Sequence, residues 1–248
     1  MRKAIAGVII YMLLTAFTAW GQDAMQFYDL GLKSSMTKRK IDYFTRALEL
    51  DPNLSVAYEK RGMLYYFQEN YPETIQDFQK VAFLKPFNSE TYVMLGLAFM
   101  KQGDLDEAIA NLSRAIELDA QGAGAYSHRS EVFRLNGMIE KAIQDSTRAI
   151  KLGGSGPIIG RAFTTRSKAY RELGQNGLAD ADFKKALKLD PDYYMYNMLT
   201  STELLANWAA ESSSLKSVGW MGVALIVSLV FVVIFKLALS VPRKDDDT

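Results

Sequence analysis

Apolar residues recur along the middle of the chain with the spacing of amphipathic helices, and the same pattern returns at a fixed interval. Five segments read alike, and their alanine or valine positions 47, 81, 115 and 149 are each 34 residues apart. The fifth, at Ala186, follows after 37 residues. A fixed period of this length is typical of a repeat array. The three extra residues predict a flexible insertion within Gly153–Pro157, where glycines cluster.

Each unit divides into two helices. In the first helix, an aromatic, a small residue and a second aromatic recur at i, i+4 and i+7, which places them on one helix face. The sets are Tyr58/Gly62/Tyr65, Tyr92/Gly96/Phe99, Tyr126/Ser130/Phe133 and Phe163/Ser167/Tyr170. The second helix buries Ile75/Phe78/Val81, Ala108/Leu112/Ala115, Ala142/Ser146/Ala149 and Ala179/Phe183/Ala186. The small residue allows the paired helix to approach closely.

The turn between the two helices carries Gly103, Gly137 and Gly174 at equivalent places. Glycine is favoured there because the residue that ends a helix often has left-handed backbone. The remaining full unit has Glu69-Asn70 there instead, and asparagine can also adopt that conformation. Asn70 is therefore the expected left-handed residue of this turn, and Pro72 suits the first turn of the next helix.

These features resemble the tetratricopeptide repeat (TPR) family, whose 34-residue unit carries aromatics, Leu-Gly, Tyr, Ala and Pro in this order. One unit matches through Tyr92, Leu95, Gly96, Phe99 and Ala108. The resemblance predicts an all-α right-handed solenoid of helix pairs, with full repeats at 55–88, 89–122, 123–156 and 160–193 and a degenerate first repeat at 22–54. That first repeat fits only with a shorter turn after its first helix, near Met25–Leu32. A helix at 194–211 is expected to cap the array, because terminal repeats lack a neighbour on one side.

The two ends of the chain have the composition of membrane signals. Arg2 and Lys3 precede an apolar run that ends in a small-x-small site at Gly21, which predicts a signal peptide at 1–21. An uncleaved anchor is the alternative. Residues 218–241 contain one charge, Lys236, and have the length of a transmembrane helix, followed by a short tail at 242–248. Both signals place the repeats on the non-cytoplasmic side of the inner (plasma) membrane, the periplasm of a bacterium, with a cytoplasmic C-terminus.

Composition excludes several functions. The 248 residues carry 29 Lys and Arg against 28 Asp and Glu, so nothing indicates a nucleic-acid partner. The absence of cysteine excludes disulfides, thiolate metal sites and a cysteine nucleophile. The single histidine, His128, lies in a helix and is more often structural than catalytic. We expect no catalytic residues, no metal and no cofactor.

Resemblance to the family implies that the first helices line a concave groove that binds a protein or peptide partner. The family's groove positions, carried over to this chain, fall on Glu59, Met63, Tyr66, Phe67, Leu97, Met100, Arg134, Arg161, Lys168 and Arg171. The first part of this surface is apolar, so apolar side chains of the partner are expected near Tyr66, Phe67 and Met100. The arginines are expected near acidic residues or a carboxylate. An equally weighted interpretation is a solvated face.

Two functions follow as alternatives. One is an exported, membrane-anchored scaffold or adaptor that is not an enzyme. The other is a C-terminally anchored receptor that faces the cytosol, which requires residues 1–21 not to act as an export signal. An enzyme would need a titratable cluster that this sequence does not show. The sequence does not decide whether copies of the chain associate.

Overall fold

The computed structural model describes residues 23–190, and this part of the chain is helical without any strand. Residues 23–33 are helical. The helices that follow are α2 (Thr37–Leu50), α3 (Ser55–Phe67), α4 (Tyr71–Leu84), α5 (Ser89–Gln102), α6 (Leu105–Leu118), α7 (Ala123–Leu135), α8 (Ile139–Leu152), α9 (Gly156–Glu172) and α10 (Asn176–Leu189). The predicted signal peptide, capping helix, membrane helix and tail lie outside the described residues.

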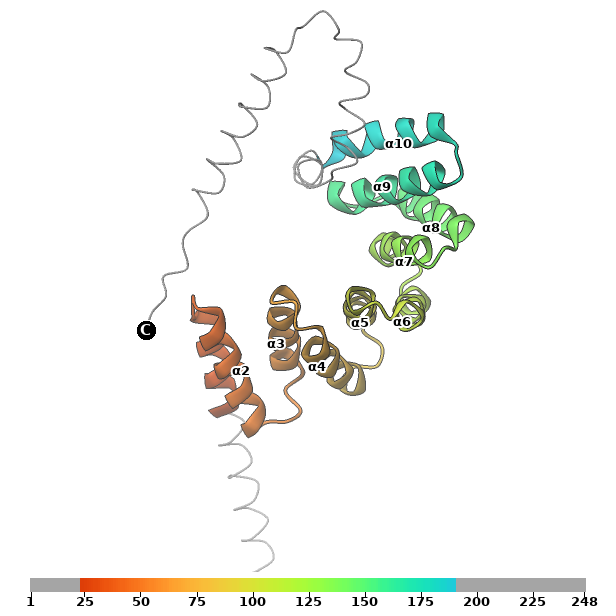
Figure 1. The fold of residues 1–248 in the computed structure, drawn as a ribbon. Coiled ribbons are helices and arrows are strands. Elements are labelled where there is room, and N and C mark those ends of the chain that lie inside the picture. The colour runs from red at the N-terminus through yellow and green to blue at the C-terminus, as the bar shows by residue number, and fades with distance from the viewer. Residues whose placement is uncertain (1–22, 191–248) are drawn as a thin grey trace, which may run out of the picture. The chain divides into compact units, whose positions relative to one another are not determined.

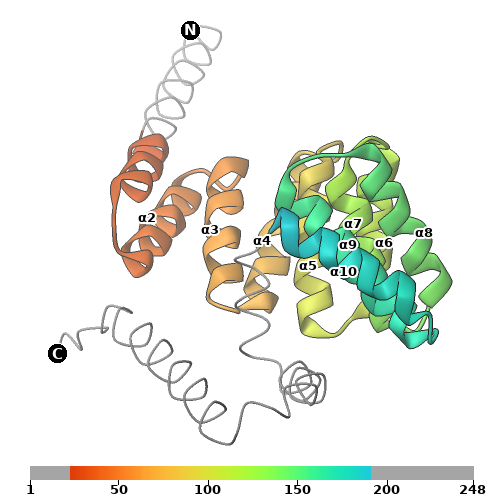
Figure 2. The same cartoon turned by 90° about the horizontal axis from the view of Figure 1, so that it is seen from above.

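The helices are arranged as a stack of antiparallel pairs. Helix α3 packs on α4, α5 on α6, α7 on α8 and α9 on α10, and the second helix of each pair packs on the first helix of the next. First helices also meet across repeats, as α7 does with α9, so that within residues 23–190 the row curves toward them (Figure 1). Figure 2 shows the same row from above, with α2 and α3 at its N-terminal end. The predicted α-solenoid is confirmed for this part of the chain.

The core is built from small residues at the positions that the period predicts. Ala108, Ala115, Ala142, Ala149 and Ala186 are all at most 1% exposed. Larger side chains fill the space between them, with Phe78, Val81 and Leu112 buried between paired helices. Because the side chain of Leu112 is completely buried, it stabilises the fold by about 2 kcal/mol.

A glycine in the first helix of a repeat allows the second helix of that repeat to pack closely against it. A Cβ on Gly96 would lie 2.5 Å from Cγ of Leu112, and a Cβ on Gly62 would lie 2.9 Å from the ring of Phe78. The two helices of the degenerate repeat also approach closely at a glycine, because a Cβ on Gly31 would lie 2.5 Å from the ring of Phe44. Its glycine and aromatic are closer in sequence than in the full repeats, which agrees with the shorter turn that the sequence predicts.

Two local expectations are wrong. Asn70 has φ −84°, and the left-handed residue of that turn is Glu69, with φ 62°, whereas Gly103, Gly137 and Gly174 are left-handed as predicted. The insertion is only partly a linker, because α9 begins at Gly156 and extends over 17 residues. Proline is accommodated in a first helical turn, where no backbone N–H donor is needed, so the extra residues lengthen this helix at its N-terminus.

Candidate partner-binding surface

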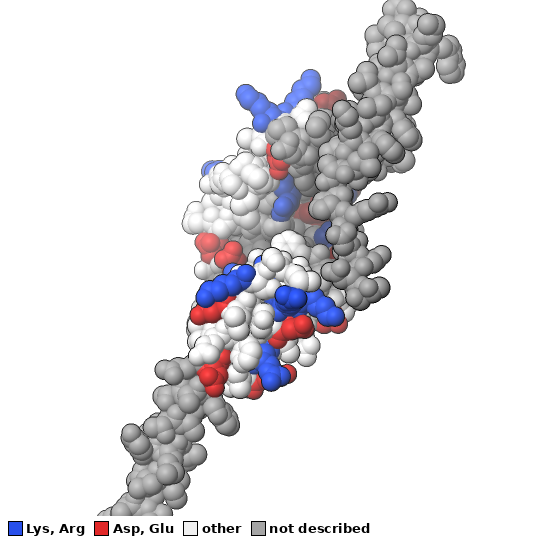
Figure 3. Space-filling view, turned by 90° about the vertical axis from the view of Figure 1, so that its left-hand side faces the viewer, with Lys and Arg blue, Asp and Glu red and all other residues white. Residues whose placement is uncertain are grey.

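All ten predicted site residues lie on α3, α5, α7 and α9, and the inner face is defined here as the side of the row that these helices form (Figure 1). Figure 3 shows the array from the left-hand side of Figure 1, where basic and acidic side chains are interspersed. The face has two chemically different ends, one on α3 and α5 and the other on α7 and α9.

The end on α3 is aromatic and partly open to solvent. Phe67 is 74% exposed and Met63 is 38% exposed. The half-buried ring of Tyr66 packs edge-on against Phe67, with centroids 6.1 Å apart, and against Tyr71, with centroids 5.9 Å apart. Glu59 on the same helix is held by Lys85, with an N–O distance of 3.0 Å.

On α5, Leu97 and Met100 continue the apolar surface. Both are half-buried, and Met100 packs against a cluster that includes Ala108, Leu112 and Val132. Met100 therefore contributes to the contact between successive repeats as well as to the surface.

The end on α7 and α9 is a network of paired charges. Arg134 binds Glu131 at 2.8 Å and Glu172 at 2.7 Å, and its side chain is only 16% exposed. Burial raises the pKa of Glu131, but hydrogen bonds and charge from Arg134, the charge of Lys168 and a bond from Thr165 outweigh it, so this pKa lies below its ordinary value. The pKa of Arg134 is raised, chiefly by its hydrogen bond to Glu131 and against the effect of burial. The positive charge of Arg134 is thus neutralised within the fold.

The remaining two arginines are also engaged. Nη1 of Arg161 lies 2.8 Å from Nε2 of His128, and burial together with this cation lowers the pKa of His128 to about 3. Arg171 turns toward α10, where it pairs with Asp180 at 3.2 Å and lies over the ring of Phe183. The predicted arginines therefore do not form one basic cluster. Lys168 is exposed on the inner face.

Helices α3 and α9 lie on the inner side of the same curved row within residues 23–190 (Figure 1). Burial is the main cause of the raised pKa of Tyr66 on α3, and the charge of Arg161 on α9 opposes this shift.

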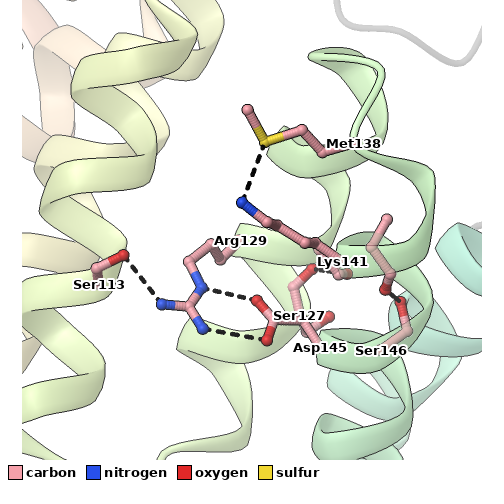
Figure 4. A network of polar contacts seen from close by, with 9 residues as sticks. Ser113, Ser127, Arg129, Met138, Lys141, Asp145 and Ser146 are labelled. Carbon is pink, nitrogen blue, oxygen red and sulfur yellow. Dashed lines mark hydrogen bonds and ion pairs between the residues drawn. The ribbon is translucent and has the colours of Figure 1, made fainter.

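A repeated polar contact between helices was not identified from the sequence. Arg129 donates to both carboxylate oxygens of Asp145, at 2.7 and 3.1 Å, and to Ser113 of the preceding repeat at 2.9 Å (Figure 4). Its guanidinium lies between the rings of Tyr126 and Phe133, 5.8 and 5.3 Å from their centroids. We call this arrangement the arginine latch.

Among the four full repeats, the latch recurs in two others and is missing from one. Equivalent sets are Arg61 with Asp77 and Thr45, and Arg166 with Asp182 and Thr147. In the remaining repeat, Leu95 and Asn111 occupy the arginine and aspartate positions, and Leu95 is 3% exposed. In the sequence, the feature that could have indicated the latch is an arginine followed 16 residues later by an aspartate.

Within the described part of the chain, no group of three or more His, Asp or Glu residues is placed to hold a metal ion. Every buried side-chain nitrogen or oxygen in residues 23–190 has a hydrogen-bond partner. Nor does any helix of this region combine the length and apolar character that crossing a bilayer requires.

Family models match two stretches of the chain, a TPR repeat model over residues 96–137 and a tetratricopeptide repeat model over residues 160–193. The chain carries tetratricopeptide repeats. This TPR array is similar to two crystal structures of MamA, one 28% identical with a TM-score of 0.56, covering 64% of this chain and 92% of that one. The other is 27% identical with a TM-score of 0.60, covering 71% and 96%.

YrrB, described as a TPR protein with an unusual peptide-binding site, shares the fold at 23% identity. Its TM-score is 0.55, over 70% of this chain and 86% of that one. No curated protein matches the chain by sequence.

Proposed function

We propose that the chain is a non-enzymatic scaffold, anchored in a membrane, whose TPR array binds an apolar or amphipathic segment of a protein partner on its inner face. The observation that carries this proposal is the contrast between the two ends of that face. Phe67 and Met63 expose apolar surface at one end, whereas the arginines at the other end are already paired. Binding free energy is therefore available from burial of apolar surface on α3 and α5.

The paired charges define what the partner presents at the other end. A carboxylate that replaced Glu131 or Glu172 at Arg134 would break hydrogen bonds of 2.7 to 2.8 Å and leave a protein carboxylate unpaired. Such an exchange gains little, because a charge left without its partner loses more free energy than the new pair returns. We expect the partner segment to be uncharged or polar where it passes α7, with at most one acidic residue near Lys168.

The membrane part of the proposal is supported by the sequence alone. The apolar segment 218–241 has the length of a membrane span, and residues 1–21 have the pattern of an export signal. The array would then lie outside the cytoplasm. Determination of the mature N-terminus by mass spectrometry tests this: Gln22 or Asp23 supports export, while an intact Met1 with protease-accessible repeats on the cytosolic side supports the receptor alternative.

Site-specific crosslinking tests the groove. A photoreactive amino acid at position 67 is used to capture the partner in membranes, and the captured protein is identified, purified and titrated against the intact chain. Met63→Glu with Phe67→Glu should weaken this affinity about a hundred-fold, since two apolar contacts of about 1.5 kcal/mol each are lost. Leu178→Glu is the matched control, because Leu178 is 52% exposed on α10, outside the inner face. Equal affinities of the two variants would refute the groove as the binding surface.

A further inference from the structure

Two phenylalanines project into solvent at the end of α4 and in the loop that follows. Phe83 is 77% exposed and Phe87 is 79% exposed, the highest values among the large apolar side chains of residues 23–190. They lie on the edge of the array where each second helix connects to the next first helix. The groove and the repeat cores use neither side chain.

Comparison among the repeats shows that these two positions are ordinarily polar. The positions equivalent to Phe83 carry Glu49, Glu117, Lys151 and Lys188, and those equivalent to Phe87 in the neighbouring loops carry Asn53 and Gln121. All of these side chains are exposed. The repeat fold therefore requires no apolar residue at either place, and the two phenylalanines need another explanation.

The surroundings of Phe83 are polar and contain lysine. Nζ of Lys80 lies 5.2 Å from the centroid of the Phe83 ring. An open depression of about 390 Å³ beside the ring is lined mainly by polar residues, among them Gln76, Asp77 and Gln79. Phe83 thus protrudes from a surface that is mainly polar.

This pattern does not match an ordinary protein interface. Two protruding phenylalanines offer roughly 300 Å² of apolar surface, whereas a stable partner buries about 800 Å² on each side. An exposed phenylalanine beside a lysine instead suits the bilayer interface, where the ring enters the boundary between headgroups and acyl chains and the amine stays near the phosphates.

We propose that the edge formed by Phe83 and Phe87 contacts the lipid interface of the membrane that anchors the chain. This inference rests on the proposed anchor. Only residues 191–217 separate the array from the predicted membrane segment, so tethering gives this edge a high effective concentration at the bilayer. Two rings that would bind lipid weakly in a free protein then suffice to orient the array, with Lys80 facing the lipid phosphates.

The absence of cysteine makes the proposal directly testable on the full chain. Phe87→Cys and, as the matched control, Gln121→Cys each receive an environment-sensitive fluorophore. The labelled chains are reconstituted into vesicles of phosphatidylcholine and phosphatidylglycerol, and quenching by aqueous iodide is measured. The label at position 87 should be quenched several-fold less than the label at position 121. Adding Phe83→Glu, the residue of two other repeats, should abolish this protection.

Equal quenching at positions 87 and 121 would overturn the proposal. So would protection at position 87 that increases with the ratio of protein to lipid, since that result indicates contact between copies of the chain. Carbonate extraction of the same vesicles tests the anchor separately. If carbonate extracts the chain, the anchor is refuted. Iodide quenching of the same labelled chains is then measured with vesicles added to the protein in solution. If the label at position 87 is not protected there either, the lipid contact is refuted as well.

Discussion

Removal of one carboxylate should show how strongly the arginine latch stabilises the array. In Asp145→Ala, the guanidinium of Arg129 loses two hydrogen bonds of 2.7 and 3.1 Å. The side chains of Arg129 and Asp145 are only 18% and 8% exposed, so water replaces the lost partner poorly. Breaking a buried pair on one side costs about 3–5 kcal/mol. Because Ser113 and two aromatic rings still contact Arg129, we expect a loss of about 2 to 4 kcal/mol.

The repeat that lacks the arginine latch shows which residues can take its place. The double variant Arg129→Leu with Asp145→Asn installs the pair found at Leu95 and Asn111. No unpaired charge remains in it, and apolar substitutes for a buried ion pair are often neutral. We therefore expect its free energy of unfolding to lie within about 1 kcal/mol of the unmodified chain.

Urea unfolding followed by far-ultraviolet circular dichroism measures both variants. Since repeat arrays can unfold in parts, hydrogen exchange of amides in α7 and α8 should accompany the titration. The reasoning is refuted if Asp145→Ala loses less than about 1 kcal/mol, or if the double variant is as unstable as the single one.

Three further outcomes are expected from the same unfolding measurements. Gly96→Ala should destabilise the chain by about 1 to 2 kcal/mol because its Cβ would meet Leu112. Gly177→Ala should stabilise the chain by about 0.5 to 1 kcal/mol, because a Cβ there would meet nothing within 4 Å and alanine favours the helix. Equal effects of the two variants would contradict the role of the close helix approach. Glu69→Gly should stabilise by up to about 1 kcal/mol, since Glu69 has φ 62°, and a loss of stability would mean that its side chain matters more than its backbone. The pKa of His128 is about 3 in the fold against 6.5 when unfolded, so the unfolded state takes up a proton first as pH falls below 6.5. Stability should drop by about 1 to 2 kcal/mol from pH 7 to pH 5, and His128→Gln should remove most of that drop.

The amino-acid pattern was sufficient for the helices and for the contacts inside each repeat. Ala108, Leu112 and Ala115 recur with the helical period, and their burial follows because a helix pair has only one way to cover that stripe. Gly103 and Gly137 mark turns because left-handed backbone is strained for other residues. In the turn without glycine, local chemistry did not decide between Glu69 and Asn70 for the left-handed backbone, and in the structure Glu69 adopts it.

Contacts between repeats were decided only in the tertiary structure. The sequence predicts that Arg134 is a free cation of the groove. In the structure Arg134 pairs with Glu172, 38 residues away, because α9 packs on α7 and brings the two side chains together. Periodicity specifies which face of a helix is buried, but the angle at which successive repeats stack determines which surface side chains meet. That angle depends on packing between repeats, and no local pattern encodes it.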